Sequence, residues 1–153
     1  MMIDLQPGDA APAFDMPTDD GRVSLAGLKG KNVVLYFYPK DDTPGCTTEA
    51  QAFTALADDF AKAGAVVVGV SRDTAAKHGK FRGKYGLTVV LGSDEDGSVT
   101  ESYGVWVEKS LYGRQYMGIE RATFLIGPDG VIRQVWRKVK VAGHAEAVLA
   151  ALA

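Results

Sequence analysis

Residues 33–49 read VVLYFYPKDDTPGCTTE and surround Cys46, the single cysteine of the chain. The β-branched and aromatic residues 33–38 predict a buried strand. Four apolar residues then follow at the helical spacing i, i+3, i+4 and i+7: Phe53, Leu56, Ala57 and Phe60. This spacing predicts a helix over about residues 47–62, with Cys46 near its first turn.

A cysteine at the start of a helix is in a position that favours chemistry on sulfur. The first turn has backbone N–H groups without intrahelical partners and the positive end of the helix dipole, and both stabilise an anion. Cysteines at helix N-termini or beside a cation have pKa values of roughly 3.5–7.5 instead of about 8.5, so the thiolate becomes the major species. Outside such a context, a lone cysteine is usually a small buried apolar residue.

The composition fits one soluble globular domain over residues 1–153. The chain is 46% hydrophobic and has a net charge of −2, with 17 Lys and Arg against 19 Asp and Glu. This balance does not indicate a nucleic-acid partner. No signal-peptide pattern and no apolar run long enough to span a membrane is present, so we expect a cytoplasmic protein. A single cysteine agrees with a reducing compartment.

Other patterns along the chain alternate between strands and helices. The predicted elements are an N-terminal hairpin within residues 14–25, strands at 65–70 and 88–91, helices at about 74–85 and 98–103, a hairpin of strands 121–126 and 131–136, and a helix after Gly143. Together with the strand at 33–38, this order predicts an α/β domain with a mixed central sheet flanked by helices. It is the order of a thioredoxin-like fold with an N-terminal hairpin extension.

The residues around Cys46 resemble the peroxiredoxin signature. The motif is Pro39-x-x-x-Thr43-x-x-Cys46 after a strand, and Arg121 opens a later strand. The longer string YFYPKDDTPGCT at residues 36–47 is similar to the bacterioferritin-comigratory, or Q-type, subfamily. The likeness extends from Gly8 to the final helix.

This resemblance implies a thiol-dependent peroxidase that reduces hydrogen peroxide and organic hydroperoxides through a sulfenic acid on Cys46. It implies that the Thr43 hydroxyl binds the sulfur or a peroxide oxygen, and that Arg121 stabilises the thiolate and polarises the peroxide. Pro39, which lacks an N–H and fixes its own φ, would shape and shield the pocket. No cofactor and no metal are expected. Whether Glu49 orients the arginine stays open.

One departure from the family pattern concerns recycling. Many Q-type members have a resolving cysteine five residues after the first, where this chain has Gln51, or on the next helix, where residues 80–84 have none. We therefore expect an external thiol reductant, such as thioredoxin, glutaredoxin or glutathione, and no internal disulfide. The Q-type resemblance is compatible with a monomer or a weak homodimer.

Two other classes of function remain open from the sequence. A thioredoxin-fold thiol transferase is one, although the chain lacks Cys-x-x-Cys, and a non-catalytic binding or chaperone module is the other. Thr43 also suits a helix cap or turn, and Arg121 suits an exposed strand position.

Several residues outside the motif are expected to be structural. We expect His78 and His144 to be surface residues, and Trp106 and Trp136 to be packing residues. Asp41 and Asp42 must face solvent or be offset by Lys40 and Arg121, because anions beside the sulfur would oppose the thiolate. The segment from Trp106 to Tyr116 has weak patterning and predicts no element.

Overall fold

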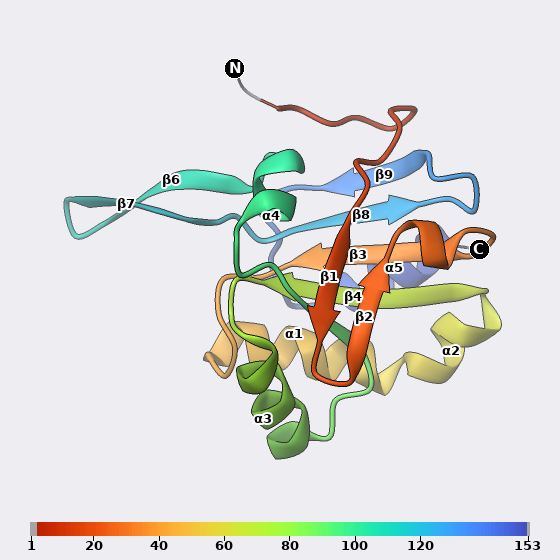
Figure 1. Cartoon of the computed structure of the whole chain (residues 1–153), viewed down its shortest axis with the longest axis horizontal. Coiled ribbons are helices and arrows are strands. Elements are labelled where there is room, and N and C mark those ends of the chain that lie inside the picture. The colour runs from red at the N-terminus through yellow and green to blue at the C-terminus, as the bar shows by residue number, and fades with distance from the viewer. Residues whose placement is uncertain (1–2, 153) are drawn as a thin grey trace.

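A computed structural model describes residues 3–152. Its strands are β1 (Asp15–Thr18), β2 (Gly21–Ser24), β3 (Asn32–Phe37), β4 (Ala65–Ser71), β5 (Val90–Ser93), β6 (Trp106–Leu111), β7 (Arg114–Ile119), β8 (Ala122–Ile126) and β9 (Ile132–Trp136). Its helices are α1 (Pro44–Ala55), α2 (Ala57–Lys62), α3 (Ala75–Tyr85), α4 (Ser98–Ser102) and α5 (His144–Ala151), with a short 3-10 helix, η1 (Ala26–Leu28). Within the described range, seven strands form one sheet in the order β2-β1-β5-β4-β3-β8-β9 (Figure 1).

The sheet is mixed, as the sequence predicts. β3 pairs in parallel with β4 and β4 with β5, whereas β8 pairs antiparallel with β3 and with β9. The predicted N-terminal hairpin is present as β1 and β2, which extend the sheet beyond β5. Among the described residues, no helix is both long and apolar enough to cross a bilayer.

β3 lies in the middle of the sheet and is covered on both faces. Successive side chains of a strand point to opposite faces. Accordingly, they enter two separate cores: Val33, Leu35 and Phe37 in one, and Val34, Tyr36 and, just beyond the strand, Tyr38 in the other. The second core is closed by residues of α1, α2, α3 and α5 and includes Cys46. The continuous apolar run at 33–38 therefore reflects burial on two sides.

The helix that follows β3 differs from its predicted bounds at both its start and its middle. α1 begins at Pro44 because proline is favoured at the first helical position and Thr43 supplies an extended backbone before it. The predicted single helix is interrupted at Leu56, which has φ −101° and ψ 14° and whose N–H bonds to the Phe53 carbonyl. The strand predicted at residues 88–91 is also displaced, to Val90–Ser93.

β6 and β7 form a separate two-stranded ribbon that the sequence did not predict. Figure 1 shows it projecting past the end of the sheet at which β3 and β4 terminate. Tyr112 and Gly113 make its turn, both with positive φ. Four large apolar residues of the ribbon are exposed: Leu111, Tyr112, Tyr116 and Met117. The base of the ribbon is closed where the Glu120 N–H donates to the Val105 carbonyl at 2.7 Å.

Candidate active site

Strand register brings two distant parts of the chain together beside Cys46. Phe37, the last residue of β3, pairs with Ala122, the first residue of β8. Arg121 therefore precedes β8 at the point where β3 ends, and residues 39–43 lead from there into α1. In this way the antiparallel pairing of β3 with β8 places Arg121 at the start of the helix that carries Cys46.

Cys46 is the third residue of α1 and is 2% exposed. The Arg121 Nη2 donates to the Cys46 Sγ at 3.4 Å. A Cβ at Gly45 would lie 3.2 Å from the same Nη2, so the guanidinium lies against the first turn of the helix. The backbone N–H groups of Gly45 and Cys46 are among those without an intrahelical acceptor. The sulfur thus has a cation and a helix N-terminus beside it, and both favour a thiolate.

Glu49 holds Arg121 in place from the next turn of α1. Its Oε1 accepts from Arg121 Nη1 at 2.6 Å, and the Glu49 side chain is 1% exposed. Burial raises the pKa of Glu49 to about 7, although the nearby Arg121 acts in the opposite direction. Its Oε2 has no hydrogen-bond partner among the described residues, so it is the oxygen available to carry a proton. The question that the sequence left open is answered: Glu49 orients the arginine.

The raised pKa of Glu49 predicts a pH-dependent stability. A carboxyl whose pKa is higher in the folded state stabilises the fold below its unfolded value of 4.5, and this stability is lost as pH rises through about 7. At about 1.4 kcal/mol per pKa unit, the loss amounts to about 3 kcal/mol. Glu49→Gln keeps an acceptor for Arg121 but does not ionise. In urea unfolding, the free energy of unfolding should fall more between pH 5 and pH 8 for wild type than for the variant. Equal falls would contradict a raised pKa of Glu49.

Thr43 and Pro39 lie on the loop before α1, and neither is hydrogen-bonded to the Cys46 sulfur as Arg121 is. The Thr43 hydroxyl donates to the Lys40 carbonyl at 2.8 Å, and the Thr43 carbonyl accepts from the Thr47 N–H. No hydrogen bond joins Thr43 to Cys46 among residues 3–152. Pro39 is exposed at the end of β3. The structure thus brings Arg121 to the sulfur, and it places Thr43 at the helix cap.

Asp41 and His78 form a buried pair, so the expectation of a surface position for His78 is wrong. His78 is fully buried, with Nδ1 2.6 Å from Asp41 Oδ2 and Nε2 3.0 Å from the Gly92 carbonyl. A carbonyl oxygen can only accept, so Nε2 carries a proton. The Tyr38 hydroxyl donates to the other Asp41 oxygen at 2.5 Å. The Asp41 carboxyl group is therefore turned into the protein and hydrogen-bonded by His78 and Tyr38, not by Lys40 or Arg121.

Asp42 faces solvent, which is one of the two expected arrangements, and two residues of α3 also bind its carboxylate. Asp42 accepts from the Lys84 ammonium at 2.9 Å and from the Tyr85 hydroxyl at 2.5 Å. These two hydrogen bonds lower the pKa of Asp42. Both aspartates of the loop are thus tied to α3, which fixes the approach to α1.

His144 is likewise buried, at 7% exposure, contrary to the expectation. Its Nε2 lies 2.8 Å from the Thr123 hydroxyl, and its ring packs edge-on against Phe53 and Trp136. Trp136 is therefore a packing residue, as predicted. Trp106 packs against the first core and carries the Arg72 guanidinium 3.3 Å from its ring centre.

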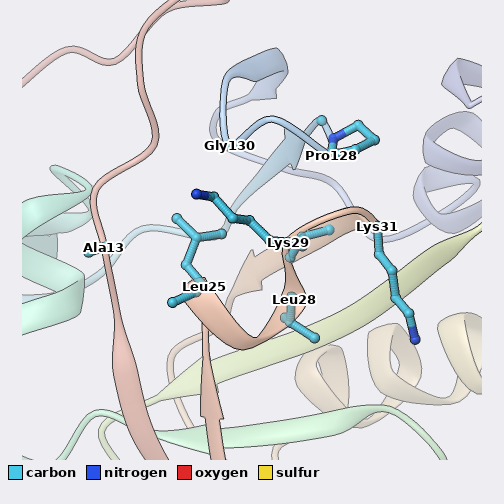
Figure 2. Close-up of a pocket in the computed structure, with 10 residues that line it drawn as sticks. Ala13, Leu25, Leu28, Lys29, Lys31, Pro128 and Gly130 are labelled. Atoms are coloured by element: carbon cyan, nitrogen blue, oxygen red, sulfur yellow. The ribbon is translucent and has the colours of Figure 1, made fainter.

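An apolar pocket of about 200 Å³ lies far from Cys46, beside Val33 at the other end of β3. Figure 2 shows Leu25, Leu28 and Pro128 around it, with the Lys29 and Lys31 ammonium groups pointing away from each other. It brings no reactive groups together. Within residues 3–152, no three His, Cys, Asp or Glu side chains are placed to hold a metal ion.

Comparisons with known proteins identify the family of the chain. Residues 7–135 match the model of the AhpC/TSA family. Peroxiredoxin Bcp of Xanthomonas campestris is 50% identical over 93% of this chain and 91% of its own length. Peroxiredoxin Bcp of Bacillus subtilis is 47% identical, with coverages of 95% and 93%.

Comparison with solved structures tests the predicted fold. A structure of the Xanthomonas campestris bacterioferritin comigratory protein superposes with a TM-score of 0.88 at 46% identity, and the match covers 99% of this chain and 97% of that one. The thioredoxin-like fold predicted from the element order is thereby confirmed. The chain belongs to the AhpC/TSA family, among the Bcp or Q-type peroxiredoxins, and it lacks their resolving cysteine.

Proposed function

We propose that the chain reduces hydrogen peroxide and organic hydroperoxides at Cys46 and is recycled by an external thiol. The observation that carries the proposal is the contact between Arg121 Nη2 and Cys46 Sγ in the first turn of α1. The neighbouring Xanthomonas protein was solved in work on its alkyl peroxide reduction activity, which supports organic hydroperoxides as substrates. Family membership favours a peroxidase over a thiol transferase or a non-catalytic module.

In the oxidising step, the Cys46 thiolate attacks the terminal oxygen of the peroxide. A sulfur–oxygen bond forms while the oxygen–oxygen bond breaks, and the alkoxide or hydroxide leaves and takes up a proton. Negative charge therefore moves from sulfur to the leaving oxygen. Arg121, held by Glu49, and the free N–H groups of Gly45 and Cys46 are donors positioned where that charge develops. Positioned donors matter because a low thiol pKa by itself weakens the nucleophile.

Thr43 and Pro39 contribute to binding of the peroxide. The Thr43 hydroxyl proton is committed to the Lys40 carbonyl, so the free lone pair of its oxygen can accept a hydrogen bond from the peroxide O–H. The fixed φ of Pro39 holds the loop between β3 and Thr43. The Asp41–His78 pair anchors the same loop on α3.

Recycling has to use a thiol from another molecule, because the chain has one cysteine. One equivalent of peroxide should convert Cys46 to a trappable sulfenic acid, visible as a gain of one oxygen in the intact mass. Excess peroxide without thiol should add two or three oxygens, since no internal thiol competes with overoxidation. Added small thiol should instead give a mixed disulfide at Cys46. Stopped-flow oxidation followed by mass spectrometry measures all three outcomes.

Gln51→Cys is the matched variant for this experiment. Residues 46 and 51 both lie in α1, and five residues rise about 7.5 Å along a helix and point in different directions, so a disulfide requires the helix start to unwind. If it unwinds, the variant should form an internal disulfide and resist overoxidation. A wild-type protein that resists excess peroxide without any thiol would contradict this account of the site.

A further inference from the structure

Lys109 lies on the ribbon face that also carries Tyr116 and Gly118. Lys109 pairs with Tyr116 across the ribbon, whereas Gly118 pairs with Val107, two residues closer to the base. The Lys109 Cδ and Cε lie 3.2 and 3.4 Å from the position that a Cβ on Gly118 would occupy. The lysine side chain therefore runs along the ribbon toward its base, and Arg121 follows Gly118 by three residues.

Lys109 is partly buried and lies within electrostatic range of Arg121 and Cys46. Burial and the nearby Arg121 cation lower the pKa of Lys109, while the charges of Cys46 and of Glu120, which is itself paired with Arg137, act in the opposite direction. Among residues 3–152, no carboxylate lies within 4.0 Å of the Lys109 ammonium. Lys109 is thus a cation that has lost part of its hydration without gaining an ion-pair partner.

The charged groups around the Cys46 sulfur include a cation that has no ion-pair partner in the described part of the chain and could bind an external anion. Glu49, the carboxylate buried next to Cys46, is already bound by Arg121 at 2.6 Å. Lys109 adds a second cation in electrostatic range of Cys46. Two cations repel each other, and an incoming carboxylate would relieve that repulsion and replace lost hydration.

We propose that Lys109 binds a carboxylate of the external thiol that reduces oxidised Cys46, a role that rests on the peroxidase function proposed above. The thiol sulfur attacks the Cys46 sulfur of the sulfenic acid. A disulfide bond forms, and the sulfur–oxygen bond breaks to release water. A second thiol molecule then attacks the outer sulfur, releasing the Cys46 thiolate and an external disulfide. Lys109 acts as the group that selects an anionic thiol and holds it for the first attack.

The single cysteine is the reason to assign Lys109 to the reductant and not to the peroxide. Every turnover needs a thiol from another molecule, whereas hydrogen peroxide is small, neutral and without a carboxylate. A cation beside the sulfur therefore raises the local concentration of an anionic thiol and does little for hydrogen peroxide.

The test measures the reduction of preformed Cys46 sulfenic acid in wild type and Lys109→Met by three small thiols of different charge. These are 3-mercaptopropionate, neutral 2-mercaptoethanol and cationic cysteamine. Lys109→Met should react about three to tenfold more slowly with 3-mercaptopropionate, equally with 2-mercaptoethanol, and faster with cysteamine, as expected for one charge near the reacting atoms. Each comparison uses a single thiol, so differences in intrinsic thiol reactivity cancel.

Two further variants make the result specific to the Lys109 site. Lys31→Met removes the same charge at the remote pocket and should leave all three rates unchanged. Gly118→Ala places a methyl group against the Lys109 stem and should reduce the rate with 3-mercaptopropionate, with no additional loss when combined with Lys109→Met.

Defined outcomes overturn the proposal. An equal loss with all three thiols, or no loss with 3-mercaptopropionate, would show that Lys109 does not bind the reductant. A loss confined to oxidation by a carboxylate-bearing hydroperoxide would assign Lys109 to the substrate. If one equivalent of hydrogen peroxide gave no sulfenic acid in wild type, the peroxidase function itself would fail, before any thiol is added.

Discussion

Cys46→Ser is expected to abolish peroxide reduction while the protein stays folded. A serine hydroxyl does not ionise near neutral pH and cannot form a sulfenic acid, and the chain has no second thiol to take over. Serine is close to cysteine in size, and its oxygen can accept from Arg121 Nη2, which now donates to the sulfur. The buried hydroxyl would therefore have a partner. Peroxide consumption with excess thiol measures the loss, and thermal unfolding with circular dichroism establishes the fold.

Turnover by a folded Cys46→Ser protein would refute the mechanism. Gln51→Ser, a substitution on the same helix that leaves Cys46 in place, is the control and should retain activity. Loss of activity in both variants would point to damage to α1 and not to loss of the thiol.

Arg121→Ala should slow oxidation of Cys46 by about 10²–10³-fold, the loss typical of removing one donor from a developing oxyanion. The variant loses the cation at 3.4 Å from the sulfur and also leaves Glu49 buried without its partner. The double variant with Glu49→Gln separates these effects, because it removes the unpaired carboxylate as well. If the loss arises from the missing cation, the double variant should be as slow as Arg121→Ala.

Arg137→Ala is the matched control for Arg121. Arg137 forms an ion pair of similar length, 2.7 Å, with Glu120, the residue next to Arg121. Removing Arg137 thus tests whether the loss of any nearby arginine ion pair is enough to slow the oxidation of Cys46. Oxidation by hydrogen peroxide in stopped flow should be close to wild type for Arg137→Ala. Equal rates for wild type and Arg121→Ala would exclude Arg121 from the chemistry.

The central part of the fold is predictable from the sequence because it is buried on two sides. The run at residues 33–38 places β3 correctly, the apolar spacing after Cys46 indicates the helical segment that is divided into α1 and α2 at Leu56, and the turn at residues 127–130 separates β8 from β9. The ribbon could not be found in this way. Most residues of β6 and β7 are partly or fully exposed, so no apolar alternation marks them as strands.

For the site, the sequence could identify Cys46 and Arg121 by their place in a motif, but it could not supply their partners. The buried positions of Glu49 and of the Asp41–His78 pair depend on contacts between residues far apart in the chain, 72 residues for Glu49 and Arg121 and 37 for Asp41 and His78. A charged residue in a polar segment is normally exposed. The signal that distinguishes these residues is pairing, and pairing is visible only in three dimensions.

The contact between Arg121 and Cys46 joins residues 75 positions apart, and this separation bears on the order of events during synthesis. At the usual 5–20 residues per second, Arg121 is added roughly 4–15 s after Cys46. The arginine reaches the sulfur only once β8 has paired with β3. Until then Cys46 lacks the Arg121 contact. If Arg121 has the role proposed above, a nascent or unfolded chain should react with peroxide more slowly than the completed fold.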